Sequence, residues 1–161
     1  MTCCSGLPQD SRAVTAPEIV ESLLATSTMV KLNHRELAEI CQMMDFGYDG
    51  VEGACRSLVA RFGWYAMCVT HGENGCSILR GNEYVEAPGY RIQVADTVGA
   101  GDAFAAAFLH GIGAGWPLEE IGDFANRLGA MVASRHGAIP IWTEADRDWL
   151  AKSRQKEINY V

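Results

Sequence analysis

The order of hydrophobic and polar residues along the first half of the chain predicts three helices and two strands, and one of these helices includes residues 36–40. Residues 17–25 and 52–62 carry apolar side chains at helical spacing. The first of these helices begins at Pro17, a residue type favoured in the first helical turn. Short apolar runs at 29–32 and 65–70 predict buried strands. Helices and strands therefore alternate along this part of the chain.

The second half continues with a predicted hairpin and three predicted helices. Residues 76–85 contain two short apolar runs separated by a Gly-Asn turn, which is typical of a hairpin. An extended run at 90–94 reads as a further strand. Residues 103–113 and 116–133 read as helices, the first of them rich in alanine, and 143–150 as a short helix.

This alternation predicts an α/β fold with three layers and a mainly parallel sheet, and with the functional site at the carboxyl ends of the strands. The chain has 161 residues, of which 48% are hydrophobic. That length suits a single domain with a packed core, so we expect one domain over 1–161. Residues 1–16 show no periodicity and are expected to be irregular.

Composition excludes several classes of function. The net charge of −7, without a basic stripe, argues against nucleic-acid binding. No apolar run approaches the length needed to cross a membrane, and residues 1–6 lack the features of a signal peptide. The six cysteines form no C-x-x-C pair and no zinc-type spacing with histidine. We therefore expect free thiols and a cytoplasmic protein.

The stretch 96–104, Asp-Thr-Val-Gly-Ala-Gly-Asp-Ala-Phe, is the strongest candidate for chemistry. Gly99 and Gly101 allow close approach of a ligand, and the first N–H groups of the following helix have no helical partner. This combination favours an anion such as phosphate. Asp102 adds a carboxylate that could accept a proton from a hydroxyl group, although an acidic residue in a first turn also favours the helix dipole without any catalytic role.

The same stretch resembles the second signature of the ribokinase (PfkB-type) carbohydrate kinases. This resemblance implies a ribokinase-like fold with Asp102 as the catalytic base. It also implies that the amides of Gly99, Ala100 and Gly101 form an anion hole for the transferred phosphoryl group. ATP and Mg²⁺ are the cofactors that the resemblance implies.

Lys31-x-Asn33-x-x-Glu36 resembles a second motif of this family. There the Asn and Glu help to position Mg²⁺, water and phosphate, so the resemblance assigns Mg²⁺ and nucleotide binding to Asn33 and Glu36. Their spacing also fits a capping box, in which Asn33 caps a helix and Glu36 returns to the cap. The two interpretations are compatible.

Further resemblances extend the predicted nucleotide site. Thr70-x-Gly72-x-x-Gly75 resembles the segment that approaches the phosphates and ribose, although a plain turn explains it equally well. The run containing Asn126 and Gly129 resembles the helix that flanks the adenine, although its small residues also suit helix packing.

The turn at 134–138 resembles one that binds a monovalent cation through backbone carbonyls. The resemblance assigns this cation, K⁺, to Asp96, Val98, Val132, Arg135 and Gly137.

The resemblance covers residues 28–145 and corresponds to the C-terminal half of such a kinase. We therefore expect a ribokinase-like fold truncated on its N-terminal side, and an ATP-dependent phosphotransferase acting on a sugar hydroxyl, of fructokinase or ribokinase type. Its partners would be a sugar substrate and either a missing N-terminal half or a second copy. The alternatives are a non-catalytic nucleotide-binding module, an inactive fragment, and a kinase for a nucleoside or vitamin-precursor alcohol.

Overall fold

The computed structural model describes residues 3–5 and 17–151, and it divides the chain into two compact units. One unit comprises 1–72 and 77–85, and the other comprises 73–76 and 86–161. The prediction of a single domain over 1–161 stays a prediction, and each unit is described by itself.

A five-stranded sheet runs in the order of the sequence. The neighbours β1–β2 and β2–β3 are parallel. The connections from β3 to β4 and from β4 to β5 are too short for a parallel crossover, so these strands are antiparallel and the sheet is mixed. The strands are β1 (Cys3–Ser5), β2 (Met29–Asn33), β3 (Ala66–Thr70), β4 (Cys76–Arg80) and β5 (Glu83–Ala87).

Three helices pack with these strands in the first unit: α1 (Pro17–Thr26), α2 (His34–Met43) and α3 (Gly50–Phe62). Their apolar faces and the strands bury a common core, centred on fully buried side chains such as Leu37, Leu58 and Met67. Trp64 joins this core and donates its ring N–H to the carbonyl of Leu24 at 2.8 Å.

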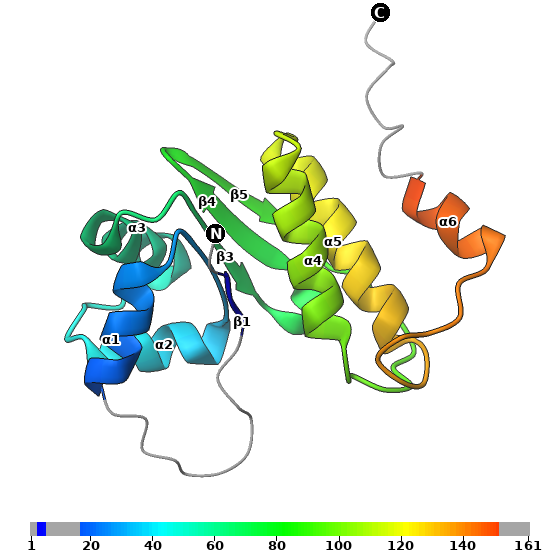
Figure 1. The fold of residues 1–161 in the computed structure, drawn as a ribbon, viewed down its shortest axis with the longest axis horizontal. Coiled ribbons are helices and arrows are strands. Elements are labelled where there is room, and N and C mark those ends of the chain that lie inside the picture. Colours follow the sequence, from blue (N-terminus) through cyan, green and yellow to red (C-terminus); the bar gives the residue numbers. More distant parts are fainter. Residues whose placement is uncertain (1–2, 6–16, 152–161) are drawn as a thin grey trace, which may run out of the picture. The chain divides into compact units, whose positions relative to one another are not determined.

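The second unit contains α4 (Ala100–Gly113), α5 (Leu118–Ala133) and α6 (Glu144–Ala151). Figure 1 shows α4 and α5 lying side by side. The Ile121 side chain of α5 packs against Gly111 of α4, where a Cβ would lie 2.7 Å from Cγ1 of Ile121. The alanine-rich sequence of α4 permits this short distance between helices.

The predicted secondary structure is wrong in two segments of the chain. Residues 90–94 form no strand, because no described strand lies beside them to accept their hydrogen bonds, and Val94 is 58% exposed. Cys3–Ser5 form β1, whereas an irregular segment was expected; a short run next to β2 needs no periodicity to pair. The rest of 1–16 lies outside the described residues.

The remaining predicted elements are present within a few residues of their expected ends, and the α/β fold class is confirmed. No described helix is long and apolar enough to span a membrane. Four described cysteines are buried and form no disulfide within the described residues: Cys41, Cys55, Cys68 and Cys76.

Candidate active site and nucleotide-binding residues

The turn before α4 presents backbone N–H groups to solvent. Gly99 caps the helix with φ 80° and ψ −12°, and the first helical bond runs from Ala103 N–H to the Gly99 carbonyl at 2.9 Å. Of the amides predicted to form the anion hole, that of Ala100 donates to the Thr97 carbonyl at 3.2 Å instead. Within the described part of the chain, the N–H groups of Gly101 and Asp102 have no hydrogen-bond partner, and both residues are exposed. Two donors at the positive end of a 14-residue helix are suited to binding an anion, and anion binding here stays a prediction.

The helix begins at Ala100, three residues before the predicted start, so Asp102 is its third residue. Its exposed side chain makes no hydrogen bond or ion pair with the other described residues. A carboxylate in this position can accept a proton from a ligand bound at the same helix end. It also favours the helix dipole, as the alternative interpretation expects.

The turn rests directly on the chain that follows α5. A Cβ on Gly99 would lie 2.7 Å from both the Cα and the Cβ of Ala138. Since this glycine also has a positive φ, no other residue type fits here without moving one of the two segments. The close approach of the turn to 134–138 is a tertiary reason for Gly99, in addition to its role in the predicted anion hole.

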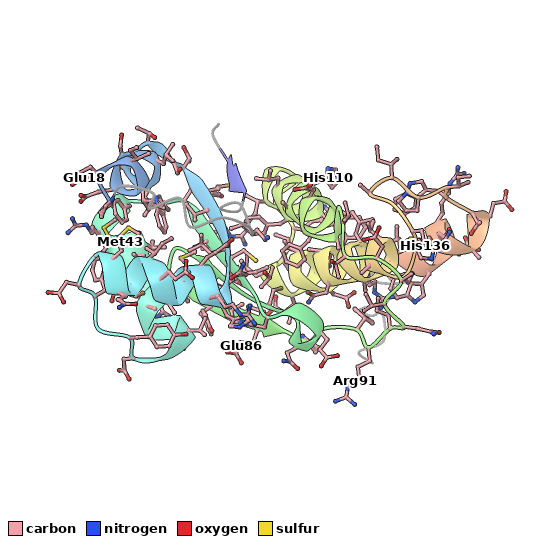
Figure 2. The ribbon with its side chains drawn as sticks, turned by 90° about the horizontal axis from the view of Figure 1, so that it is seen from below. Glu18, Met43, Glu86, Arg91, His110 and His136 are labelled. Carbon is pink, nitrogen blue, oxygen red and sulfur yellow. The ribbon has the colours of Figure 1, made fainter. Side chains whose placement is uncertain are left out.

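Asp96 joins the same two segments through its carboxylate. One oxygen accepts the N–H of Val98 at 3.0 Å, and the other accepts the N–H of Gly137 at 3.1 Å. These two hydrogen bonds hold the pKa of Asp96 below its usual value, and the charge of His136, on the turn after α5 (Figure 2), adds to the effect. Arg91, five residues before Asp96, points away from the helices (Figure 2).

Three of the five residues predicted to bind K⁺ meet at the Asp96 carboxylate. Asp96 and Val98 lie on one side, and Gly137 lies on the other. The carbonyl of Val132 accepts the N–H of Arg135 at 3.1 Å, which forms the turn after α5. The Asp96 side chain is already engaged with backbone N–H groups, so a cation here would depend on backbone carbonyls. K⁺ binding stays a prediction.

In the first unit, Asn33 and Glu36 form the predicted capping box. The Asn33 side-chain oxygen accepts the N–H groups of Arg35 and Glu36, each at 2.9 Å. In return, Oε2 of the buried Glu36 accepts the N–H of Asn33 at 2.8 Å. The structural interpretation of the motif is confirmed, and Mg²⁺ binding stays a prediction.

Thr70 lies beside Asn33, because the two residues are register partners at the carboxyl ends of β3 and β2. Its hydroxyl donates to the carbonyl of Leu32 at 3.4 Å. Gly72 follows, with no atom within 4 Å of the position that a Cβ would take. The first unit therefore places Asn33, Glu36 and Thr70 together at one edge of parallel strands, the edge where α/β proteins bind ligands.

Gly75, Asn126 and Gly129 belong to the second unit, where each has a packing role. The buried Asn126 amide donates to the carbonyls of Ala87 at 3.2 Å and Pro88 at 3.1 Å. A Cβ on Gly129 would lie 3.4 Å from the carbonyl oxygen of Ala100, so Gly129 packs under the first turn of α4. These contacts support the packing interpretation, and nucleotide binding by the three residues stays a prediction.

A cluster that the sequence interpretation missed holds the approach segment, residues 88–95. The Tyr90 hydroxyl donates to Asp123, and the Arg127 guanidinium donates to Asp123 at 3.1 Å and to the carbonyl of Trp149 at 3.1 Å. The guanidinium carbon also lies 5.0 Å from the Tyr90 ring centre. The only signal in the sequence was the Asp123–Arg127 spacing of four residues on one helix.

Two solved structures with a similar fold are described as kinases. A ribokinase from Thermotoga maritima superposes with a TM-score of 0.70 at 24% identity, over 86% of this chain and 47% of that one. A nucleoside kinase from Burkholderia thailandensis, solved with inosine, gives 0.70 at 23% identity, over 85% and 44%. The protein therefore has a ribokinase-like α/β fold.

The sequence comparison identifies the family. The model described as "pfkB family carbohydrate kinase" matches residues 6–145, so this chain belongs to the pfkB family of carbohydrate kinases. Probable fructokinase-5 of Arabidopsis thaliana is 40% identical over 98 residues, which cover 56% of this chain and 30% of that protein. The chain thus matches less than half the length of each of these three relatives.

Proposed function

We propose that this chain carries the ATP-dependent phosphotransfer machinery of a sugar kinase, with Asp102 as general base. The observation that carries the proposal is the start of α4, where two N–H groups without partners stand next to the Asp102 carboxylate. Family membership supports it, as do the names of relatives, among which are a fructokinase and a ribokinase.

The residues at this turn fit the phosphates of ATP. Gly101 has no side chain to obstruct an anion, and its N–H and that of Asp102 are available donors. For Mg²⁺, which prefers oxygen ligands and retains several waters, Glu36 is a suitable residue. Its capping box uses Oε2, which leaves Oε1 for a metal-bound water.

When bound, Mg·ATP supplies the phosphoryl group. The side chain of Asp102 accepts the proton of the sugar hydroxyl, and the N–H groups of Gly101 and Asp102 stabilise negative charge on the transferred group. Gly99 packs this turn against Ala138.

The test compares the wild-type chain with Asp102→Asn, using Mg·ATP and either fructose, ribose or inosine. We expect turnover with a sugar to fall by about 10²–10⁴-fold in the variant. Affinity for Mg·ATP, measured by titration calorimetry, should change little, since the N–H donors remain. Turnover close to that of the wild type would show that Asp102 only favours the helix dipole.

A nucleotide-binding module without turnover is the second candidate. It is favoured by the extent of the match, which covers 30% of the Arabidopsis fructokinase, because a sugar must also be held in place for efficient transfer. Binding of Mg·ATP by the wild-type chain, with no turnover of any of the three acceptors, would support this candidate. Turnover of inosine alone would indicate a nucleoside acceptor.

A further inference from the structure

We propose that the Asp96 side chain is a positioning residue, which holds the anion-binding turn of α4 in its binding-competent form by tying it to the chain after α5. The inference rests on the proposed function, since the turn is the phosphate site of that proposal. It assigns to the carboxylate a role separate from the K⁺ contact predicted at this residue.

The carboxylate bridges two segments that are far apart in the sequence. Its bond to Val98 N–H closes the turn locally, and its bond to Gly137 N–H spans 41 residues. The backbone reinforces the link, because the N–H groups of Ala95 and Asp96 both donate to the carbonyl of Ala133, at 2.9 and 3.2 Å. The start of the turn is thus fixed to the end of α5.

The segment behind the turn is itself held in place. Arg135 donates to the carbonyl of Ile141 at 3.0 Å and forms an ion pair with the buried Asp146. Asp146 also accepts the N–H and the hydroxyl of Thr143, both at 2.7 Å. The contact between Gly99 and Ala138 therefore sets the turn against a supported surface.

Two acceptor oxygens are needed at position 96, which is why a carboxylate is suited to it. In Asp96→Asn the amide keeps one acceptor, and its NH₂ group then faces a backbone donor. We expect the bond to either Val98 or Gly137 to be lost. The turn can then move away from Ala138, and the N–H groups of Gly101 and Asp102 lose their common orientation.

The loss of charge and the loss of positioning predict opposite effects of Asp96→Asn on anion affinity. Removing a negative charge near an anion site should strengthen anion binding. Loss of positioning should weaken it. The control is Asp148→Asn, which also removes one negative charge from the second unit. The Asp148 side chain is exposed and makes no hydrogen bond or ion pair with the other described residues.

The experiment titrates Mg·ATP into the wild-type chain and both variants by calorimetry, well below their melting temperatures, with and without KCl. We expect Asp96→Asn to bind about tenfold more weakly, with or without KCl, and Asp148→Asn to bind as the wild type does or slightly more tightly. Equal or tighter binding by Asp96→Asn would overturn the inference. Weakening seen only with KCl would also overturn it, since that result would indicate a cation ligand.

Two further measurements test whether Asp96 positions the turn. Asp96→Ser retains a short acceptor for Val98 N–H but cannot reach Gly137, so it should weaken binding as Asp96→Asn does. Amide NMR spectra without nucleotide should show shifted or broadened Gly101 and Asp102 signals in Asp96→Asn and Asp96→Ser, but not in Asp148→Asn. If the wild-type chain does not bind Mg·ATP, the proposed function fails, and the spectra alone decide whether Asp96 positions the turn: unchanged signals would refute it.

Discussion

The backbones of Gly75 and Gly89 pass so close to each other that neither residue has room for a side chain. A Cβ on Gly75 would lie 2.5 Å from the nitrogen of Gly89, and a Cβ on Gly89 would lie 2.6 Å from the nitrogen of Gly75. Two backbone segments of the second unit therefore pass in direct contact. Gly75 was predicted to approach a nucleotide, and the structure supplies an independent reason for a glycine at this position.

The first prediction concerns this crossing. Gly75→Ala should lower the free energy of unfolding by about 3 kcal/mol or more, because the clash is with backbone atoms and φ is +101°. Gly81→Ala is the matched control, since Gly81 also has a positive φ but no atom within 4 Å of its Cβ position. Its cost should be about 1 kcal/mol. Urea unfolding measures both, and equal midpoints would contradict the close approach.

The second prediction separates the two interpretations of Asn126. Its buried amide donates to the carbonyls of Ala87 and Pro88, so Asn126→Leu should lower the free energy of unfolding by about 1–3 kcal/mol without any nucleotide present. Asn74→Ala, at an exposed asparagine, should cost less than about 0.5 kcal/mol. If Asn126→Leu had wild-type stability and lost only nucleotide affinity, the packing interpretation would be wrong.

The third prediction concerns Arg127, which binds Asp123, the Trp149 carbonyl and the faces of two aromatic rings. Arg127→Lys keeps the charge but loses the planar group that serves all of these partners at once. We expect a loss of about 1–3 kcal/mol in unfolding free energy, close to that of Arg127→Met. Thermal melts of both variants test this, with Arg147→Lys, exposed on α6, as control. Full stability of the lysine variant would show that charge alone matters.

The fourth prediction is a loss of stability in acid. Hydrogen bonds from the N–H and hydroxyl of Thr143 lower the pKa of Asp146, and Arg135 adds to the effect. Because the native pKa lies below the ordinary value of 3.8, the stabilisation is complete above that value. It is lost as pH falls through the native pKa. Asp96 follows the same rule, with bonds from Val98 and Gly137 as the cause.

Melting temperatures between about pH 6 and pH 3 test this prediction. The decline of melting temperature in acid should be shallower in Asp146→Asn and in Asp96→Asn than in the wild type. Each variant lacks one carboxylate that binds a proton less readily in the native state than in the unfolded state. Asp148→Asn should keep the wild-type slope. A wild-type slope in both of the first two variants would show that these hydrogen bonds do not form in solution.

Features that depend on neighbouring residues could be predicted from the sequence. The capping box of Asn33 and Glu36 requires a spacing of three residues at a helix start, and it forms as expected. The hairpin of β4 and β5 follows from its two-residue turn. The glycines before α4 indicated a helix start with available N–H groups, although the helix begins at Ala100, because alanine and glycine carry no boundary signal of their own.

The extended run at 90–94 shows why the rest could not be predicted. Its alternating residues are compatible with a strand, but a strand exists only where a neighbour accepts its hydrogen bonds. Here the segment is held by Asp123 and Arg127 on α5 instead. The choice between these outcomes depends on residues more than 30 positions away.

The sequence by itself determined the fold class, the family signature and the capping box at Asn33, because these depend on periodicity and on contacts within a few residues. Only the tertiary structure decided which segments support the turn at α4. The bond from Asp96 to Gly137, the contact of Gly99 with Ala138 and the crossing of Gly75 with Gly89 join distant parts of the chain. Such contacts are selected by packing of whole elements, so no pattern in the nearby sequence indicates them.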